Sequence, residues 1–498
     1  MNNGINKKMG IWGVTLLISF LYAQHENWVY RFNGPANTSD ICYSVVYGSD
    51  GKIYGGGVAT NPSPYYTDWC ILSLNPDGTQ PWMYFPSGWE NAECNNIVYG
   101  SDNNIYGVGW FWDYPGFGIL SLTNLGSYRW EYLTGLGEGY GIIYGRDNNI
   151  YACGYVWGED WWPDFAVVSV TTSGAERWVY IYTLAGSEYD HAYSLTQDED
   201  YNIYAAGQIQ NKFTVISLTN TGAVRWIYTH QTSSCANSIV YGNDGNIYVA
   251  GNGVILCLNR NTGQKTWEYT FGSNLYSLIY GGDGNLYMCS GNTILSLKNT
   301  GEYRWAYSLS GASFSNICYG IDGNIYACGG ISNNILLIKI NSNNGQLMWQ
   351  YTYEGPGNGN DYAYSICCDA SGNIYIGGFS TGIGTQADFT IISVKDLYLG
   401  EYEVLPRQDD AKDKNNFHIS TSNFFNDKIH LKLNGFYDKE LIISLYDVTG
   451  KKLFSQKFIP NKSITISDKR ILNLSKGVYL LVINSEQKEI DKIKLIKR

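Results

Sequence analysis

Aromatic side chains gather in three segments of the chain, residues 58–68, 110–117 and 155–164, each with acidic residues nearby. Tyrosine and tryptophan rings stack on sugar rings or peptide side chains at a low cost in conformational entropy. The segments therefore predict a binding platform for a glycan or a protein, and the competing interpretation is that the rings pack over the rest of the fold. The candidate ligand contacts are Tyr65, Tyr66, Trp110, Trp112, Tyr114, Trp157, Trp161 and Trp162.

Residues for catalysis or for a metal are few. None of the five histidines has zinc-motif spacing, and the chain has neither a G-x-S-x-G elbow nor a phosphate-binding glycine loop. We therefore predict no catalytic residue, no cofactor and no metal site. Ca²⁺ is left open, because Asp198-Glu199-Asp200 clusters several carboxylates as calcium loops do.

Three phrases recur eight times each and predict the elements that hold these residues. The phrase Y-S-I-x-Y-G-x-D-G-N-I-Y-x-x-G is marked by its last tyrosine, W-x-Y by its tryptophan, and an I-x-S-L phrase lies between them. The tyrosines are Tyr54, Tyr106, Tyr151, Tyr204, Tyr248, Tyr287, Tyr326 and Tyr375. The tryptophans are Trp28, Trp82, Trp130, Trp178, Trp226, Trp267, Trp305 and Trp349.

Each unit is interpreted as four short strands, with x-D-G-N as a hairpin turn. Four strands in 40–50 residues are typical of a β-propeller blade. The first W-x-Y, at Trp28, precedes the first unit, and no W-x-Y follows the last unit. We therefore predict an all-β, eight-bladed β-propeller whose N-terminal strand closes the last blade.

The acids of the repeats are predicted to have structural roles. One set forms a ring of turn acids, namely Asp50, Asp102, Asp147, Asp200, Asp244, Asp283 and Asp322, with Ser371 in the eighth place. A second set lies before first or third strands and is predicted to accept hydrogen bonds from loop backbone amides. Its members are Asp40, Asp190 and Asp361 before first strands, and Asp68, Asp164 and Asp388 before third strands.

The repeats resemble two known groups. The segment 259–267, N-R-N-T-G-Q-K-T-W, is similar to the T-G-x-x-x-W signature of pyrroloquinoline-quinone-type propeller repeats, and residues 190–194 and 361–365 resemble bacterial β-propeller repeats. Some quinone-dependent dehydrogenases carry adjacent bonded cysteines over the cofactor, so the resemblance raises the same question for Cys367-Cys368. These two residues lie within a first-strand phrase, where the repeat pattern explains them.

The chain has 11 cysteines, an odd number, so at least one is unpaired. Cys153, Cys289 and Cys328 each lie two residues after the marker tyrosine. We interpret most cysteines as small buried apolar residues between sheets. A disulfide framework is the alternative.

Composition agrees with a β-protein and excludes one partner class. Aromatic and charged residues each make up 15% of 498 residues, with 44 Tyr and 57 Gly, which fits a β-protein with many tight turns and neither a disordered nor a helical chain. The net charge of −11 divides into +7 for residues 415–498 and −18 for the rest. An acidic surface excludes nucleic acid, whose phosphates need a basic one.

The two ends of the chain predict export. Residues 1–23 have the basic start, the short apolar core and the small residue before the cut that are typical of a signal peptide, and we predict no transmembrane segment in the mature chain. Residues 24–396 are the predicted propeller and residues 397–416 a polar linker. Seven short strand patterns in residues 417–498 predict a small β-sandwich.

The sandwich resembles the type A C-terminal sorting domain of the type IX (Por) secretion system. The resemblance rests on residues 443–451 (I-S-L-Y-D-V-T-G-K), 474–481 (L-S-K-G-V-Y-L-L) and the basic end 492–498, whereas the usual Pro-Asn-Pro opening is replaced by N-N-F at 415–417. It implies contact with that secretion machinery through residues 417–498 and a place on the outer cell surface or in the extracellular space. Removal of the tail, with attachment to lipopolysaccharide or release, would follow.

These observations favour a secreted or surface-attached, non-enzymatic propeller that binds a glycan or a protein through an aromatic loop face. The alternatives are an enzyme, either quinone-dependent dehydrogenase-like or acting on polysaccharides, and a structural scaffold propeller. The ligand's identity is not encoded in any motif.

Overall fold

The computed structural model describes residues 23–62, 66–86, 91–111, 116–183 and 189–397, and, in a second unit, Leu474 and the strand residues between 418 and 497. Neither the predicted signal peptide up to residue 22 nor the predicted linker from residue 398 lies within the described residues. No helix in the described part of the chain is long and apolar enough to cross a membrane.

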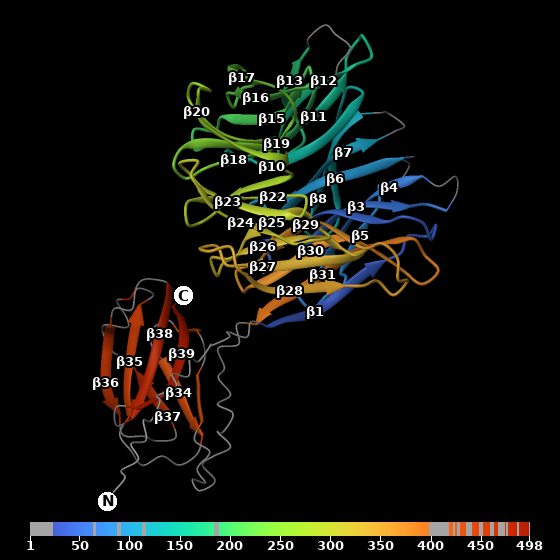
Figure 1. Ribbon diagram of the computed structural model, residues 1–498. Coiled ribbons are helices and arrows are strands. Elements are labelled where there is room, and N and C mark those ends of the chain that lie inside the picture. Colours follow the sequence, from blue (N-terminus) through green and yellow to red (C-terminus); the bar gives the residue numbers. More distant parts are fainter. Residues whose placement is uncertain are drawn as a thin grey trace, which may run out of the picture. The chain divides into compact units, whose positions relative to one another are not determined.

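Residues 23–397 form eight antiparallel sheets in chain order, which are the eight predicted blades (Figure 1). Blade 1 consists of β2 (Ile41–Tyr47), β3 (Ile53–Thr60), β4 (Thr67–Leu74) and β5 (Trp82–Tyr84). Blade 2 consists of β6 (Ala92–Tyr99), β7 (Asn104–Phe111), β8 (Gly116–Thr123) and β9 (Tyr128–Thr134). Blade 3 consists of β10 (Gly137–Tyr144), β11 (Asn149–Trp157), β12 (Pro163–Thr171) and β13 (Glu176–Tyr182). Blade 4 consists of β14 (His191–Gln197), β15 (Ile203–Ile209), β16 (Lys212–Leu218) and β17 (Val224–Ser233).

The second half repeats the plan with one merged strand. Blade 5 consists of β18 (Ala236–Tyr241), β19 (Asn246–Asn259) and β20 (Lys265–Asn274), and β19 fills both middle positions because residues 247–251 pair with β18 and 252–258 with β20. Blade 6 consists of β21 (Ser277–Tyr280), β22 (Asn285–Ser290), β23 (Thr293–Lys298) and β24 (Tyr303–Ser308). Blade 7 consists of β25 (Ala312–Tyr319), β26 (Ile325–Ile331), β27 (Asn334–Ile340) and β28 (Leu347–Tyr353). Blade 8 consists of β29 (Tyr362–Cys368), β30 (Asn373–Thr381), β31 (Ala387–Leu397) and β1 (Ala23–Phe32).

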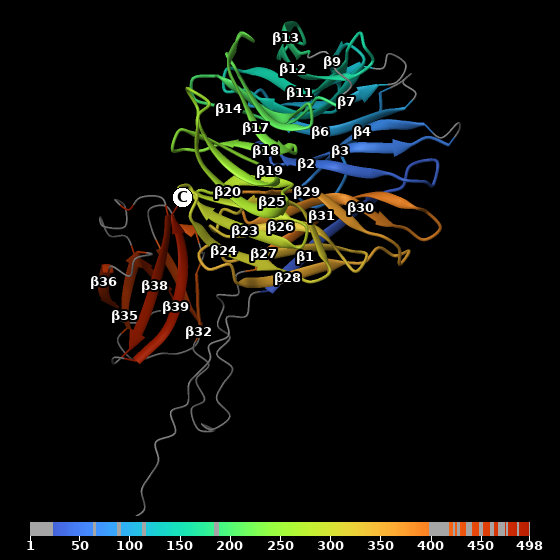
Figure 2. The same cartoon turned by 45° about the horizontal axis from the view of Figure 1, so that its top comes forward.

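The N-terminal strand closes the ring, as predicted. β1 pairs antiparallel with β31, with Trp28 opposite Ser393, and supplies the outer strand of blade 8. Both views show β1 beside β31 and β28 (Figures 1 and 2). The sheet of blade 8 thus contains strands from both ends of the propeller segment, which ties the ring closed.

Burial explains why the middle strands are so apolar. β3 is buried along its whole length, and β4 along all but its first residue, because the two faces of each blade pack against neighbouring blades. The predicted burial of Cys153, Cys289 and Cys328 is confirmed, since none has exposed surface.

The repeated tryptophans tie each blade to the next. The Trp178 indole N–H donates to the Asn220 carbonyl oxygen at 2.9 Å, and its ring covers Gly222 in the same turn. Gly222 has φ +84°, and a Cβ there would lie 2.7 Å from the indole, so both the turn and the ring require glycine. Equivalent indole-to-carbonyl bonds join Trp28, Trp82, Trp130, Trp226, Trp267 and Trp305 to the following turn.

The marker tyrosines are buried and donate to turn acids. The Tyr54 hydroxyl, for example, donates to Asp50 at 2.6 Å. In blades 4 and 8 the acceptors are Asp198 and Asp369, two residues before the predicted Asp200 and Ser371. The predicted turn acids thus accept from the marker tyrosine in six blades, and in the other two an aspartate two residues earlier in the same turn does so.

The described strands of the C-terminal unit form two sheets. One contains β32 (His418–Thr421), β34 (Ile429–Asn434) and β37 (Ser463–Ile466). The other contains β33 (Phe424–Phe425), β39 (Lys488–Lys497), β38 (Gly477–Ser485), β35 (Leu441–Asp447) and β36 (Lys452–Phe458). Buried residues of both sheets, such as Leu431 and Leu481, share one core, as expected for a small sandwich.

Candidate ligand-binding face

The first strands of the eight blades form a closed circle at the centre of the propeller. β2, β6, β10, β14, β18, β21, β25 and β29 each contact the next in this order, and β29 contacts β2. The loops that enter these inner strands and the hairpins from second to third strands lie on one face, which we call the loop face. The predicted ligand contacts that the structure describes, Tyr66, Trp110, Trp157, Trp161 and Trp162, lie at this face.

Seven of the inner strands carry a β-bulge near the loop face. The extra residue at each bulge is Tyr43, Asn95, Tyr140, Tyr193, Asn237, Ser315 or Tyr364. We call these seven residues the bulge ring. Bulges re-aim a side chain and recur next to functional sites.

Members of the bulge ring contact the neighbouring inner strand. Tyr43 and Tyr364 meet edge-to-face at 5.6 Å between ring centroids, and Tyr140 stacks on Tyr193 at 5.7 Å. The Asn95 amide donates to the Glu138 carboxylate at 2.9 Å. Sequence reasoning missed this ring, although the opening tyrosine of the Y-S-I-x-Y phrase was its visible signal.

An aromatic cluster lies between blades 3 and 4. His191 stacks on Tyr155 at 4.5 Å, and Tyr155 in turn meets Trp157 edge-to-face at 5.8 Å. Trp162 meets Tyr189 edge-to-face at 5.5 Å. The rings are thus held in place by one another, which lowers the entropy lost when a ligand stacks on them.

Burial keeps this cluster uncharged. It lowers the pKa of His191 from its ordinary value to about 4, because the imidazolium loses hydration. A nitrogen of the same ring lies 3.2 Å from the Tyr193 hydroxyl. At neutral pH His191 is therefore a neutral polar group among aromatic rings.

The predicted ligand contacts divide into exposed, partly buried and undescribed residues. Trp161 is 73% exposed and Trp157 38%, so both present ring surface to solvent. Tyr66, Trp110 and Trp162 are partly buried. Tyr65, Trp112 and Tyr114 lie outside the described residues.

A cavity of about 790 Å³ lies on the loop face over blades 6 to 8. Its aromatic lining comprises Phe314 and four rings near the rim, which are Tyr276, Tyr362, Tyr364 and Phe379. Asn333, Asn360 and Ser313 supply polar groups between them. Sequence reasoning placed the aromatic loops on blades 1 to 3, whereas this hollow forms where those loops are missing.

The acids before first strands organise the loops, as predicted. Asp361 accepts hydrogen bonds from the Thr381 and Gly355 backbone amides at 2.7 and 2.6 Å. Asp40 accepts from two amides in the same way, and burial raises its pKa to about 6 despite these bonds. Asp190 accepts from the Gln210 amide at 2.7 Å.

The acids before third strands accept from side chains, and the prediction of backbone amides was wrong for them. Asp68 accepts from the Asn61 amide group, and Asp164 from the Thr183 hydroxyl at 3.1 Å. Asp388 pairs with Arg31. The reason is that the hairpin or neighbouring strand supplies a side-chain donor at each of these positions.

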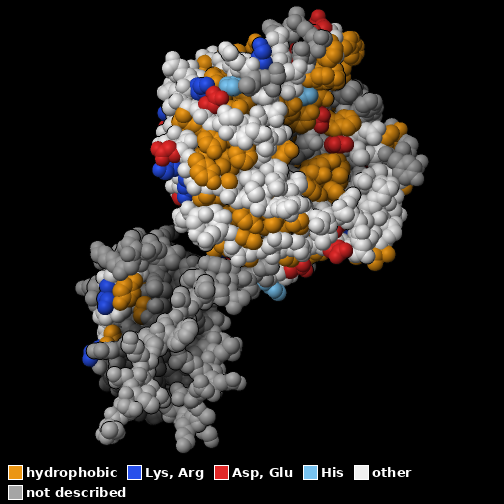
Figure 3. Space-filling model, in the orientation of Figure 1, with side chains coloured by type: hydrophobic (Ala, Val, Ile, Leu, Met, Phe, Trp, Pro, Cys, Tyr) orange, Lys and Arg blue, Asp and Glu red, His pale blue; other side chains and the backbone are white. Residues whose placement is uncertain are grey.

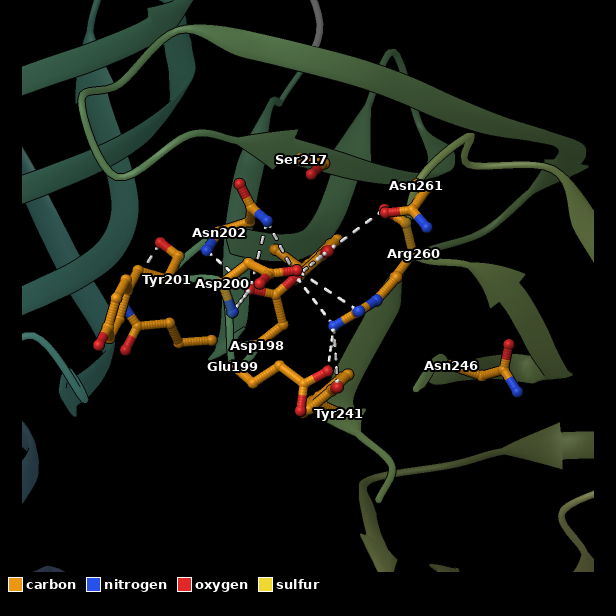
Figure 4. A network of polar contacts seen from close by, with 12 residues as sticks. Asp198, Glu199, Asp200, Tyr201, Asn202, Ser217, Tyr241, Asn246, Arg260 and Asn261 are labelled. Atoms are coloured by element: carbon orange, nitrogen blue, oxygen red, sulfur yellow. Dashed lines mark hydrogen bonds and ion pairs between the residues drawn. The ribbon is translucent and has the colours of Figure 1, made fainter. Parts of the chain in front are cut away.

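The acidic turn Asp198-Glu199-Asp200, for which Ca²⁺ binding was an open possibility, forms ion pairs with an arginine (Figure 4). The Arg260 guanidinium, from the next blade, lies 3.0 Å from Glu199 and 3.4 Å from Asp200. It also donates to the Tyr241 hydroxyl at 3.1 Å. Within the described residues, no group of three His, Cys, Asp or Glu side chains is placed to hold a metal ion.

Apolar side chains form several patches on the face of the propeller seen in Figure 3, with few charged side chains between them. The lining of the cavity is similarly low in charge, because it includes one carboxylic acid, Asp361, and no lysine or arginine. Electrostatic attraction therefore contributes little to binding there, and ring stacking and hydrogen bonding contribute most.

Two family models match the chain. Residues 211–392 match the model described as outer membrane protein assembly factor BamB, and residues 423–498 match the secretion system C-terminal sorting domain. No curated protein matches the chain.

Solved structures share the propeller fold at low identity. BamB from Moraxella catarrhalis aligns with a TM-score of 0.50 and 13% identity over 75% of this chain and all of its own. Quinohemoprotein alcohol dehydrogenase from Comamonas testosteroni aligns at 0.54 and 10%, over 74% and 76% of the two chains. Sqt1 from Chaetomium thermophilum aligns at 0.55 and 10%, over 75% and 100%. These similarities show the fold alone.

The sorting domain fixes the destination. Residues 423–498 mark the chain for export by the type IX secretion system to the cell surface or the extracellular space. Residues 211–392 of the propeller are similar to PQQ-like repeats of the BamB type.

Proposed function

We propose that this exported propeller binds a neutral glycan through its loop face and does no chemistry on it. The observation that carries the proposal is the aromatic-rimmed cavity over blades 6 to 8. Its volume of about 790 Å³ falls within the roughly 300–1,000 Å³ that is usual for ligand pockets. The exposed rings Trp157 and Trp161, with Trp162, supply a second stacking position on the same face.

The cavity lining suits carbohydrate chemistry. Tyr276, Tyr362 and Phe379 line the cavity, and aromatic side chains pack against the apolar side of a sugar. Asn333, Asn360 and Ser313 offer donors and acceptors to sugar hydroxyls. Aromatic rings and neutral amides in one concave site favour a sugar over an ionic metabolite.

The charges of the lining favour a neutral glycan over an acidic one. Asp361 is the ionisable acid there, and its carboxylate oxygens already accept two backbone amides. A uronate or sulfate would meet this negative charge with no lysine or arginine in the lining to balance it.

A glycan array with the exported protein tests the proposal, followed by titration calorimetry with the best neutral oligosaccharide. Tyr276→Ala and Tyr362→Ala should weaken binding about tenfold or more, a loss of about 1.4 kcal/mol, which lies within the roughly 1–3 kcal/mol that a base gains by stacking on one aromatic ring. Ile321→Ala is the matched control, because Ile321 is 70% exposed in a turn away from the loop face. Absence of glycan binding, or equal loss in all three variants, would refute the proposal.

The enzyme alternatives require a separate assay. Purified protein is mixed with pyrroloquinoline quinone and Ca²⁺, and dye reduction is followed with alcohols and aldoses. Separately, array-positive glycans are incubated and analysed for chain shortening. We expect neither activity, and either one would contradict a purely binding role.

A scaffold role is the second candidate, favoured by the match of residues 211–392 to the BamB model. A scaffold would contact a protein partner over blades 5 to 8, where the cavity also lies. Cross-linking on intact cells distinguishes the two roles. A partner protein captured by the wild type and lost in Tyr276→Ala, together with an empty glycan array, would favour the scaffold.

A further inference from the structure

Two cysteines from neighbouring blades meet at the junction of blades 7 and 8. The Sγ atoms of Cys318, on β25, and Cys368, on β29, lie 2.6 Å apart. Non-bonded carbon atoms prefer separations of about 3.5–4.0 Å, and sulfur is larger, so two thiols at this distance are compressed. We propose that Cys318 and Cys368 form a disulfide that joins blade 7 to blade 8 in the exported protein.

Comparison with the other blades shows which contact the pair of Cys318 and Cys368 replaces. In the Y-S-I-x-Y phrase of the inner strand, Cys318 stands at position x and Cys368 at the last tyrosine. At five other junctions that tyrosine packs against the marker tyrosine of the preceding blade. These pairs are Tyr47–Tyr375, Tyr99–Tyr54, Tyr144–Tyr106, Tyr280–Tyr248 and Tyr319–Tyr287, at 5.3–6.0 Å.

At the junction of blades 7 and 8 the inner strand supplies no tyrosine ring for Tyr326. Blade 4 also lacks the tyrosine, and there Gln197 accepts a hydrogen bond from the Arg146 backbone amide at 2.6 Å. A lost ring contact is thus replaced by another bond at that junction. A covalent bond between Cys318 and Cys368 is the corresponding replacement at the junction of blades 7 and 8.

The neighbouring Cys367 is not an equivalent partner. Successive side chains of a strand point to opposite faces. Cys368 packs with the core between blades 7 and 8, whereas Cys367 packs with the core between blades 8 and 1. A bond between Cys367 and Cys368 would pull one of them out of its own core, so Cys318 is the favoured partner of Cys368.

Export supplies the conditions for oxidation. The route passes through an oxidising compartment, in which disulfides form by exchange with thiol–disulfide oxidoreductases. The two thiols lose two protons and two electrons, and one disulfide of the oxidoreductase is reduced to two thiols. Burial and the adjacent Cys368 raise the pKa of Cys318 well above its ordinary value in the folded protein, so little of the reactive thiolate is present once the two blades have packed.

Peptide mapping of the exported protein tests the proposal. The protein is denatured with an alkylating agent, digested without reductant and analysed by mass spectrometry. We expect the peptide containing Cys318 to be linked to the one containing Cys368, with fragment ions assigning the bond to Cys368, and nine of the 11 cysteines to be alkylated. Alkylation of all cysteines, or a bond between Cys367 and Cys368, would overturn the proposal.

Three variants control for the position of the bond and its effect on stability. Cys318→Ser should leave Cys368 open to alkylation, and Cys367→Ser should keep the cross-link. Reductant should lower the unfolding temperature of the wild type by several degrees and leave the Cys318→Ser/Cys368→Ser variant unchanged. An equal effect of reductant on both proteins would contradict a stabilising bond.

Discussion

The Trp349 indole N–H donates to the Asp396 carboxylate at 2.8 Å, at the one junction where the usual acceptor is missing. In the other seven blades the indole donates to a carbonyl in the turn between third and fourth strands of the next blade. Blade 8 has no such turn, because its third strand, β31, and its fourth strand, β1, come from opposite ends of the propeller. At the closure a side-chain carboxylate therefore accepts the indole hydrogen bond that a backbone carbonyl accepts in the other blades.

Removal of Asp396 should destabilise the propeller strongly. Besides Trp349, Asp396 accepts from the Tyr326 hydroxyl at 3.0 Å and pairs with Lys339, whose side chain is 1% exposed. Asp396→Ala should lower the free energy of unfolding by about 3–5 kcal/mol, as when one partner of a buried ion pair is removed. Urea denaturation measures the loss.

Glu302→Ala is the control for that measurement. Glu302 pairs with Lys298, and both side chains are more than half exposed. This variant should change the free energy of unfolding by about 0–1 kcal/mol. Equal losses of unfolding free energy in the Asp396 and Glu302 variants would show that the contacts of Asp396 stabilise the propeller no more than an exposed ion pair does.

The cation beside the marker tyrosine differs between blades 6 and 7: it is an arginine on the fourth strand in blade 6 and a lysine on the third strand in blade 7. In blade 6, Arg304 on the fourth strand donates to Tyr287 and Ser296. In blade 7 a lysine, Lys339, replaces that serine on the third strand, Met348 replaces the arginine, and the lysine ammonium lies 2.7 Å from Asp322. Burial alone would raise the pKa of Asp322, but Lys339 holds it below its ordinary value.

Transplanting the blade 6 arrangement should restore stability. Lys339→Ser alone should cost about 3–5 kcal/mol, because Asp322 and Asp396 lose their buried cation. Adding Met348→Arg should recover most of that loss, as the new guanidinium reaches the position that Arg304 has in blade 6. A double variant no more stable than Lys339→Ser would contradict the equivalence of the two cations.

His191 should make stability depend on pH. Its pKa is about 4 in the folded protein and about 6.5 in an unfolded chain, so the unfolded chain binds more protons between these values. The contribution of His191 is fully present above about pH 6.5 and is lost as the pH falls towards 4. In His191→Gln the acid-induced loss of stability between pH 7.5 and about pH 4.5 should shrink by about 2–3 kcal/mol, as measured by urea denaturation.

A loss of stability equal to that of the wild type would contradict a depressed pKa for His191. Tyr193→Phe is the matched variant. It removes the hydroxyl 3.2 Å from the imidazole and leaves the burial of the ring in place, so the pH dependence should persist.

Much of the fold follows from the sequence because each blade repeats the same physical solution. The residue types of Trp178, Gly222 and Tyr151 recur in the repeat at similar positions. In each case a tryptophan donates to a turn of the next blade, a glycine in that turn makes room for the indole, and a buried tyrosine packs in the core. The closure by β1 follows from counting, because Trp28 has no earlier strands of its own. Departures such as Asp369 for Ser371 depend on which carboxylate reaches Tyr375, which spacing alone does not reveal.

The loop face was less predictable, for a physical reason. The cavity is bounded by residues far apart in the chain, such as Tyr276 and Phe379, so it depends on how blades 6, 7 and 8 are placed beside one another. Local composition identifies long aromatic loops, whereas a cavity between distant segments has no local signal in the sequence. The bulge ring likewise depends on one added residue in each of seven inner strands. The opening tyrosine of the Y-S-I-x-Y phrase marks its position, but the strand pattern does not show that this residue is bulged.

The C-terminal unit should be needed for export and not for propeller folding. Its described strands have a core of their own, formed by residues such as Ile443 and Phe454. Deletion of residues 417–498 should therefore leave a folded propeller in the periplasm. Cell fractionation with immunoblotting measures its location, and the unfolding temperature of the retained protein reports its folding. Normal export of the truncated protein would contradict the role of the sorting domain.

Single substitutions should reveal which part of the loop face binds the ligand. Tyr276 is 48% exposed at the cavity, and Trp161 is 73% exposed on the loops of blade 3. If the cavity is the principal pocket, Tyr276→Ala weakens glycan binding about tenfold or more and Trp161→Ala weakens it less, because a flat exposed ring buries less of the ligand than a concave site. Calorimetric titration of both variants measures the ratio, and a larger loss in Trp161→Ala would move the principal site to blades 3 and 4.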